Sequence, residues 1–96
     1  MIVNERETPE GLLVAVCDAD VLGERFEGDD VTLEVTEKFY GGEIADEATV
    51  VDSLARATVA NIVGTQAVDL AIEEGFVDEA NVLEVGDTKH AQLLWM

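Results

Sequence analysis

The chain has 96 residues, and its 22 Asp and Glu against five Lys and Arg give it a formal charge of −17. This length excludes two independent cores, because each half would be too small to bury enough surface for a stable fold, so we expect one domain over residues 1–96. A lone cysteine excludes an intrachain disulfide, and no apolar run approaches the about 20 residues of a membrane span, which together predict a cytoplasmic protein without a membrane partner.

The first third of the chain predicts a hairpin, a loop and a strand. Residues 2–6 and 12–17 are apolar enough for two strands, and the Thr-Pro-Glu-Gly between them has turn chemistry. Residues 18–30 carry charges and two glycines, which predicts a short helical turn and a loop. Residues 31–37 alternate strictly between apolar and polar side chains, which is the clearest strand pattern in the sequence.

Two helices are predicted in the middle of the chain. Asp46 can cap the first, and Thr65 can cap the second, which ends before Gly75. Their apolar positions recur at helical spacing and are Val50, Val51, Leu54 and Ala57 in the first, and Val68, Ala71 and Ile72 in the second. Residues 58–63 between them fit either a helical continuation or a short strand.

The C-terminal residues predict a second hairpin. Residues 82–85 and 89–95 flank a Gly-Asp-Thr connection with turn chemistry. In the last strand Ala91, Leu93 and Trp95 would share one face, and His90, Gln92 and Leu94 the other. Strands, then helices, then strands predict an α+β fold with a mainly antiparallel sheet and two main helices.

The acidic residues are spread along the chain and interleaved with Val, Leu and Ala. This favours a folded domain with an acidic surface over a disordered acidic tail. In molar salt the Debye length is about 3 Å, so such surface charges barely repel one another. We therefore interpret the sequence as a cytosolic protein of a halophile.

No constellation of residues predicts catalysis, a metal site or a cofactor. The glycine patterns that bind nucleotide phosphates are absent. The stretch Asp18-Ala19-Asp20-Val21-Leu22-Gly23 matches the start of a calcium-binding loop, but Leu22 replaces a ligand. Cys17 and His90 could meet as thiol and base, yet Cys17 lies in an apolar strand, where a free cysteine is usually a buried hydrophobe.

The stretch Lys-Phe-Tyr-Gly-Gly-Glu at residues 38–43 holds the only tyrosine, the only adjacent glycine pair and one of the five cations. A positive charge, flat rings and backbone amides without a Cβ in the way are what a single-stranded nucleic acid or a nucleotide contacts. The alternative is structural: Phe39 closes the core under the sheet while the glycines shape a strand-to-helix turn.

His90 is the only histidine and follows a cation in the last predicted strand. Its ring can stack, donate and accept near neutral pH, although an edge-strand histidine can equally bond to backbone or water. The candidate binding residues are Lys38, Phe39, Tyr40, Gly41, Gly42, His90 and Gln92.

Three stretches together resemble one protein family. They are Phe39-Tyr40-Gly41-Gly42-Glu43 after a strand, Ala60-Asn61-Ile62-Val63-Gly64 before a helix, and His90-Ala91-Gln92 in the last strand. In this order and over this length, the sequence resembles the archaeal domain-of-unknown-function family 424. The resemblance covers nearly the whole chain and implies an archaeal host, but it implies no activity.

Two functions remain open from the residues. The first is a non-catalytic binding module of the archaeal translation and RNA machinery that contacts RNA or a ribonucleoprotein. The second is a small protein-interaction subunit that docks through a sheet edge or through the apolar C-terminus, residues 93–96. A small enzyme is a weaker hypothesis, because no groups with complementary chemistry converge in the sequence.

Overall fold

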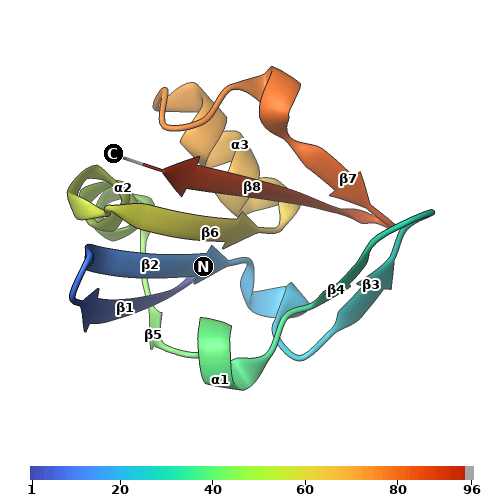
Figure 1. Ribbon diagram of the computed structural model, residues 1–96, viewed down its shortest axis with the longest axis horizontal. Helices are drawn as coiled ribbons and strands as arrows, with labels where there is room; N and C mark the ends of the chain where they lie inside the picture. Colours follow the sequence, from blue (N-terminus) through green and yellow to red (C-terminus); the bar gives the residue numbers. More distant parts are fainter. Residues whose placement is uncertain (95–96) are drawn as a thin grey trace.

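A six-stranded sheet, in the order β5-β1-β2-β6-β8-β7, forms the centre of the computed structural model (Figure 1), which describes residues 1–94. Its strands are β1 (Ile2–Thr8), β2 (Gly11–Cys17), β5 (Glu43–Ile44), β6 (Val59–Val63), β7 (Leu83–Val85) and β8 (Thr88–Leu94). The other elements are β3 (Arg25–Glu27), β4 (Thr32–Glu34), the helices α1 (Glu37–Tyr40), α2 (Glu47–Arg56) and α3 (Thr65–Glu73), and the 3₁₀ turns η1 (Ala19–Val21) and η2 (Glu79–Asn81).

Every neighbouring pair in the large sheet is antiparallel except β2 and β6, which run parallel. The predicted α+β class with a mainly antiparallel sheet is therefore confirmed. Both predicted hairpins form, and residues 59–63 adopt the strand alternative. Within residues 1–94, no helix is long and apolar enough to cross a membrane.

The first face of the sheet is covered by α2 and α3, which lie behind the strands in Figure 1. Val14 and Val16 of β2 point into this core, where they meet Val50 and Leu54 of α2, all four fully buried. The apolar spacing of α2 thus did predict its inner face. Asp46 caps α2 as predicted, because its carboxylate accepts a hydrogen bond from the third helical amide at 2.9 Å.

The predicted cap of α3 is wrong. Gly64 occupies the N-cap position with a φ of +112°, and Thr65 makes no capping hydrogen bond. The cap comes instead from the end of β2, where the Asp18 carboxylate accepts hydrogen bonds from the amides of Gln66 at 3.0 Å and Ala67 at 2.8 Å. Asp18 is 6% exposed, so this contact is part of the folded interior.

The second face of the sheet is covered at one end only. There Cys17 and Val63 pack against Val21, Val35 and other residues of η1, α1 and the β3–β4 hairpin. In Figure 1 α1 lies at the bottom of the molecule, and β3 and β4 lie at the right. The other end of this face lies outside this cluster.

The prediction of one strand over residues 31–37 is wrong in extent and in place. Only Thr32–Glu34 are in a strand, and β4 pairs with β3 in a separate two-stranded sheet. β3 itself lies within the predicted loop. The strand ends early because Thr36 starts a helix, and Val31 at its other end is 42% exposed. Trp95, predicted to share a face with Ala91, lies outside the described residues, as does Met96.

Candidate functional site

The Lys-Phe-Tyr-Gly-Gly stretch forms α1 and the turn after it. The Thr36 hydroxyl oxygen caps α1 by accepting a hydrogen bond from the Phe39 amide at 3.3 Å. Tyr40 is 5% exposed and belongs to the same cluster as Ile2 and Cys17. Burial raises the pKa of Tyr40 to about 12, so its phenol stays protonated. Tyr40 is therefore a core residue, and its buried ring cannot stack on a base.

Gly41 and Gly42 lie against the protein's own backbone. A Cβ atom on Gly41 would lie 2.3 Å from the carbonyl oxygen of Glu37, and one on Gly42 would lie 2.1 Å from that of Val3. The Asn4 side-chain amide also donates a hydrogen bond to the Gly41 carbonyl. Gly41 thus lets the chain turn closely against α1, and Gly42 lets it pass closely over β1. The glycines have the structural role of the alternative reading, but they shape a helix-to-strand turn, and Tyr40 in place of Phe39 is the buried ring.

Phe39 is half-buried and lies beside Arg6, a residue that sequence reasoning missed. The Phe39 and Tyr40 rings meet edge-on, with centroids 4.9 Å apart and an interplanar angle of 76°. The Arg6 guanidinium carbon lies 5.3 Å from the Phe39 centroid, within cation–π range. Arg6 also donates a hydrogen bond to the Lys38 carbonyl. We call Arg6, Lys38 and Phe39 the cationic cluster.

The cationic cluster contains the basic side chains that have no carboxylate partner within residues 1–94. The other three cations are paired: Arg25 with Glu27 and Glu34, Arg56 with Glu5 and Asp52, and Lys89 with Asp69. A chain with 22 acidic residues offers many partners, so two basic residues without a carboxylate partner that meet at the Lys38 backbone are an unusual local arrangement. They remain available to an anionic ligand.

The uncovered end of the second sheet face presents two rows of side chains. Residues two apart in a strand share a face. Ile2, Cys17 and Val63 lie on the face that packs against Tyr40, so the residues two and four positions away from them in each strand lie on the same face. The first row is Asn4, Ala15, Asn61 and Gln92, in which Ala15 is only 2% exposed and the Asn4 amide donates to the Gly41 carbonyl, so its surface part is Asn61 and Gln92. The second row is Arg6, Leu13, Val59 and Leu94. We call these residues the open face, and in Figure 1 this part of the sheet points toward the viewer.

The open face combines amides with apolar side chains. Gln92 Nε2 donates a hydrogen bond to Asn61 Oδ1 at 3.2 Å, so the two amides form a pair across β6 and β8. In the neighbouring row Leu94 is 61% exposed, while Leu13 and Val59 are half-buried. Arg6 belongs both to this row and to the cationic cluster, so the open face and the cluster form one continuous surface.

His90 lies on the same sheet face, one row beyond the open face and beside Val63. Burial lowers the pKa of His90, so its imidazole is neutral at pH 7. The row that runs from Ile2 through Cys17 and Val63 to His90 crosses three strand spacings, or about 14 Å. His90 and α1 therefore lie on one face of the sheet, with β1 and His90 at opposite ends of this row, and a polymer that follows the row could contact both.

His90 also predicts a pH dependence of stability. Because its pKa is lower in the folded than in the unfolded state, the unfolded chain binds the proton more readily. We expect the free energy of unfolding to fall as the pH drops below about 6.5, the usual histidine pKa, and His90→Gln to remove that decrease. Urea unfolding of both proteins at pH 7.5 and 5.5 measures this, and equal pH dependence in the two would contradict it.

Glu5 also makes stability depend on pH, but in a lower pH range than His90 does. Hydrogen bonds from Arg56 and Ser53 hold the pKa of Glu5 below its usual value of 4.5. Its contribution is therefore complete above about pH 4.5 and is lost only as the pH falls toward the folded pKa. Glu5 therefore does not contribute to a difference in unfolding free energy between pH 7.5 and 5.5.

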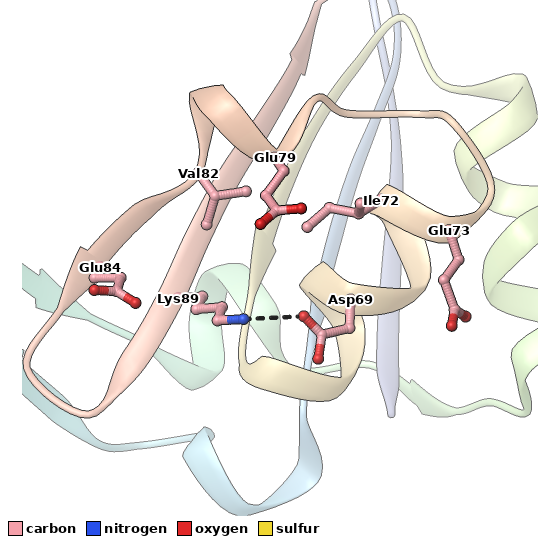
Figure 2. A pocket seen from close by; sticks show the side chains of 7 residues that line it. All are labelled: Asp69, Ile72, Glu73, Glu79, Val82, Glu84 and Lys89. Carbon is pink, nitrogen blue, oxygen red and sulfur yellow. Dashed lines mark hydrogen bonds and ion pairs between the residues drawn. The ribbon is translucent and has the colours of Figure 1, made fainter.

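An acidic pocket lies on the other side of the sheet (Figure 2). It has a volume of about 540 Å³ and is lined by Asp69, Ile72, Glu73, Glu79, Val82, Glu84 and Lys89. Lys89 Nζ donates to Asp69 Oδ1 at 3.1 Å, so the pocket's cation is already neutralised. Within residues 1–94, no three His, Cys, Asp or Glu side chains are arranged to hold a metal ion.

The remaining chemical candidates have structural roles. Burial, with the nearby Asp18 carboxylate, raises the pKa of the Cys17 thiol to about 11, so the thiol is not a nucleophile at neutral pH. Cys17 and His90 are separated by β6 in the sheet. Asp18, the first position of the calcium-loop match, is bonded to the amides of α3.

Sequence reasoning missed Arg6 and Asn61 as surface residues. Asn61 is the one polar residue in the strand Val59–Val63, and a lone amide in an apolar strand is a signal that could have been followed. Arg6 gave no such signal, because its contact with Phe39 depends on how α1 packs onto β1.

The comparisons with known proteins agree with this fold. A family model described as "Protein of unknown function (DUF424)" matches residues 5–96. The chain is also similar to a solved structure described as "Crystal structure of an uncharacterized conserved protein from Methanopyrus kandleri", with a TM-score of 0.78, 23% identity, and coverage of 99% of this chain and 92% of that one. No curated protein matches the sequence. At this identity the structural similarity shows a shared fold alone.

Proposed function

This chain belongs to the DUF424 family, as the stretches around Phe39, Asn61 and His90 predicted, and because that family has no assigned activity we propose from the residues that it is a non-catalytic module that binds single-stranded RNA. The binding surface is the open face together with the cationic cluster. The observation that carries this proposal is the charge arrangement. The two basic residues without carboxylate partners in residues 1–94 are in contact, since Arg6 donates to the Lys38 carbonyl, and the Arg6 guanidinium lies over the Phe39 ring beside the open face.

Each part of the surface matches one part of the ligand. Arg6 and Lys38 can contact phosphates, and the guanidinium plane and the exposed part of Phe39 can stack on a base. Asn61 and Gln92 offer hydrogen bonds to base edges. Single strands are favoured over duplexes, because only unpaired bases can lie flat against a sheet.

The strong negative charge limits where such binding takes place. In dilute salt an RNA would be repelled by the rest of the protein surface, whereas molar salt screens charges beyond about 3 Å. Stacking and hydrogen bonds would then provide most of the affinity. We therefore place the protein in the cytoplasm of a salt-adapted archaeon, and the acidic composition supports this.

The test compares two double variants with equal charge change. We expect Arg6→Gln/Lys38→Gln to weaken binding of a fluorescent random-sequence 15-nucleotide RNA about tenfold or more, since a hydrogen bond to a charged group contributes about 1.5 kcal/mol or more. The matched control is Arg25→Gln/Lys89→Gln, which removes two cations already paired with carboxylates. Fluorescence anisotropy across a KCl series from dilute to molar gives the affinities.

Two outcomes would overturn this proposal. One is that the protein binds no RNA at any salt concentration. The other is that both double variants lose affinity equally, because the loss would then reflect net charge and not the cationic cluster.

The apolar row supports protein docking as a second candidate. Leu94 is 61% exposed and continues a row with the half-buried Leu13 and Val59. Ile44 is 86% exposed but lies apart from this row, on the edge strand β5. Contiguous exposed apolar side chains mark protein interfaces. A pull-down in molar KCl with and without nuclease separates the two: a protein partner that survives nuclease and is lost with Leu94→Ser would favour docking.

A further inference from the structure

The amide pair occupies the centre of the open face. Asn61 and Gln92 are register partners on β6 and β8, and the residues on either side of them in each strand point into the core beneath. Gln92 is exposed and Asn61 is half-buried. Two amides therefore lie side by side at a surface whose other central members are apolar.

Most of the hydrogen-bonding capacity of this pair is unused by the pair itself. A side-chain amide has two N–H donors and a carbonyl oxygen with two lone pairs. The 3.2 Å bond uses one donor of Gln92 and one lone pair of Asn61. Gln92 keeps one N–H donor and its carbonyl oxygen, the two kinds of group that pair with atoms of a base edge.

Adenine is the base that such an amide recognises best. Asn and Gln form two hydrogen bonds with adenine, to its N6 amino group and the adjacent ring nitrogen, and such a bidentate contact discriminates against other bases. Adenine also has the larger ring system for stacking on the guanidinium of Arg6 or on Phe39. The stacking surface therefore favours a purine, and the amide contact selects adenine among the purines.

Gln92 and the cationic cluster are too far apart to contact the same nucleotide. Gln92 lies in the row of Asn4, three strand spacings or about 14 Å from β1 and the cationic cluster. A strand a few nucleotides long that runs across β1, β2, β6 and β8 can place a phosphate at one end and a base at the other.

We infer that the Asn61–Gln92 pair reads adenine in single-stranded RNA that lies across the open face. This inference rests on the proposed function, and it adds base preference to a surface that would otherwise contact only the backbone and ring faces. It assigns Gln92 the direct contact and Asn61 the positioning of that amide through the hydrogen bond between them.

The experiment measures the anisotropy of fluorescent A10, C10 and U10 RNAs with the wild-type protein and with Gln92→Met, which keeps the side-chain length but removes its hydrogen bonds. We expect A10 to bind about tenfold more tightly than U10 or C10, as one bidentate contact predicts. In Gln92→Met the affinity for A10 should fall to about that for U10, with a smaller loss for U10 and C10 than for A10. Gln66→Met on α3 is the matched control, because Gln66 is the other glutamine in the sequence and is also exposed.

The outcomes separate this inference from the proposed function. Equal binding of the three RNAs by the wild-type protein, or an equal loss for all three in Gln92→Met, would overturn base reading. The RNA-binding proposal would still stand in that case if Arg6→Gln/Lys38→Gln weakened all three RNAs. Failure of every RNA to bind would overturn both.

Discussion

Replacing Gly64 with alanine is expected to lower the free energy of unfolding by about 3 kcal/mol or more. Gly64 has a φ of +112°, and holding a non-glycine residue in such a region costs about 1–3 kcal/mol. The added Cβ would also lie 2.3 Å from the Asp18 carboxylate carbon and 2.6 Å from one of its oxygens. The carboxylate would have to move, and its hydrogen bonds to α3 would be lost with it.

Thermal unfolding in molar KCl measures this effect. For a domain of this size about 3 kcal/mol corresponds to a decrease in Tm of about 12 °C or more. Gly23→Ala is the matched control, because Gly23 has a φ of +85° but no atom within 4 Å of the added Cβ. We expect it to cost only the backbone strain. Equal decreases in Tm for both variants would show that the contact with Asp18 contributes nothing.

Asp18→Ala is expected to destabilise the fold by about 2–4 kcal/mol. The carboxylate accepts two backbone hydrogen bonds at the N-terminus of α3, where the helix dipole also favours a negative charge. Removing it leaves the amides of Gln66 and Ala67 without these acceptors. The loss is large because Asp18 is 6% exposed, so water cannot easily replace it.

The control is the exposed cap of α2. Asp46 accepts one hydrogen bond at 2.9 Å in solvent, so Asp46→Ala should cost about 1 kcal/mol. Denaturant unfolding compares the two variants, and hydrogen exchange should show faster exchange of the Gln66 and Ala67 amides in Asp18→Ala. Equal decreases in the free energy of unfolding for Asp46→Ala and Asp18→Ala would contradict a larger contribution from the buried cap of α3.

Local patterns predicted the parts of the fold that depend on neighbouring residues. The hairpin of β1 and β2, the inner face of α2 and the final hairpin each follow from periodicity and turn residues within a short segment. The failures depend on distant contacts. Thr65 looked like a cap because nothing near it in the sequence shows that Asp18 reaches the same amides.

The strand prediction for residues 31–37 failed for a related reason. Alternation from Val31 to Val35 shows that one side of the chain is buried, but it does not say in which sheet. β4 pairs with β3, and a capping threonine at position 36 turns the chain into α1. A local cap therefore outweighed a strand pattern that continued for three residues beyond Glu34.

The candidate binding residues stay a prediction, and the structure shows only where their side chains lie. The stretch around Phe39 does border an uncovered surface, and Gln92 lies on it, yet Tyr40 and the glycines pack inward. Which of two adjacent aromatic rings faces the core depends on the rotation of α1, and this rotation is set by contacts with β1. The same contacts bring Arg6 to Phe39, and no spacing rule in the sequence connects positions 6 and 39.

The parallel pairing of β2 and β6 has a consequence for how the molecule assembles. It joins a half made of β5, β1 and β2 to a half made of β6, β8 and β7, as Figure 1 shows. Closing the chain between Cys17 and Val59 costs about 3 kcal/mol of loop entropy, far more than either hairpin, so the seam should form late in folding. An RNA that contacts Arg6 on one half and Gln92 on the other would act as a clamp across this seam and slow the separation of the halves.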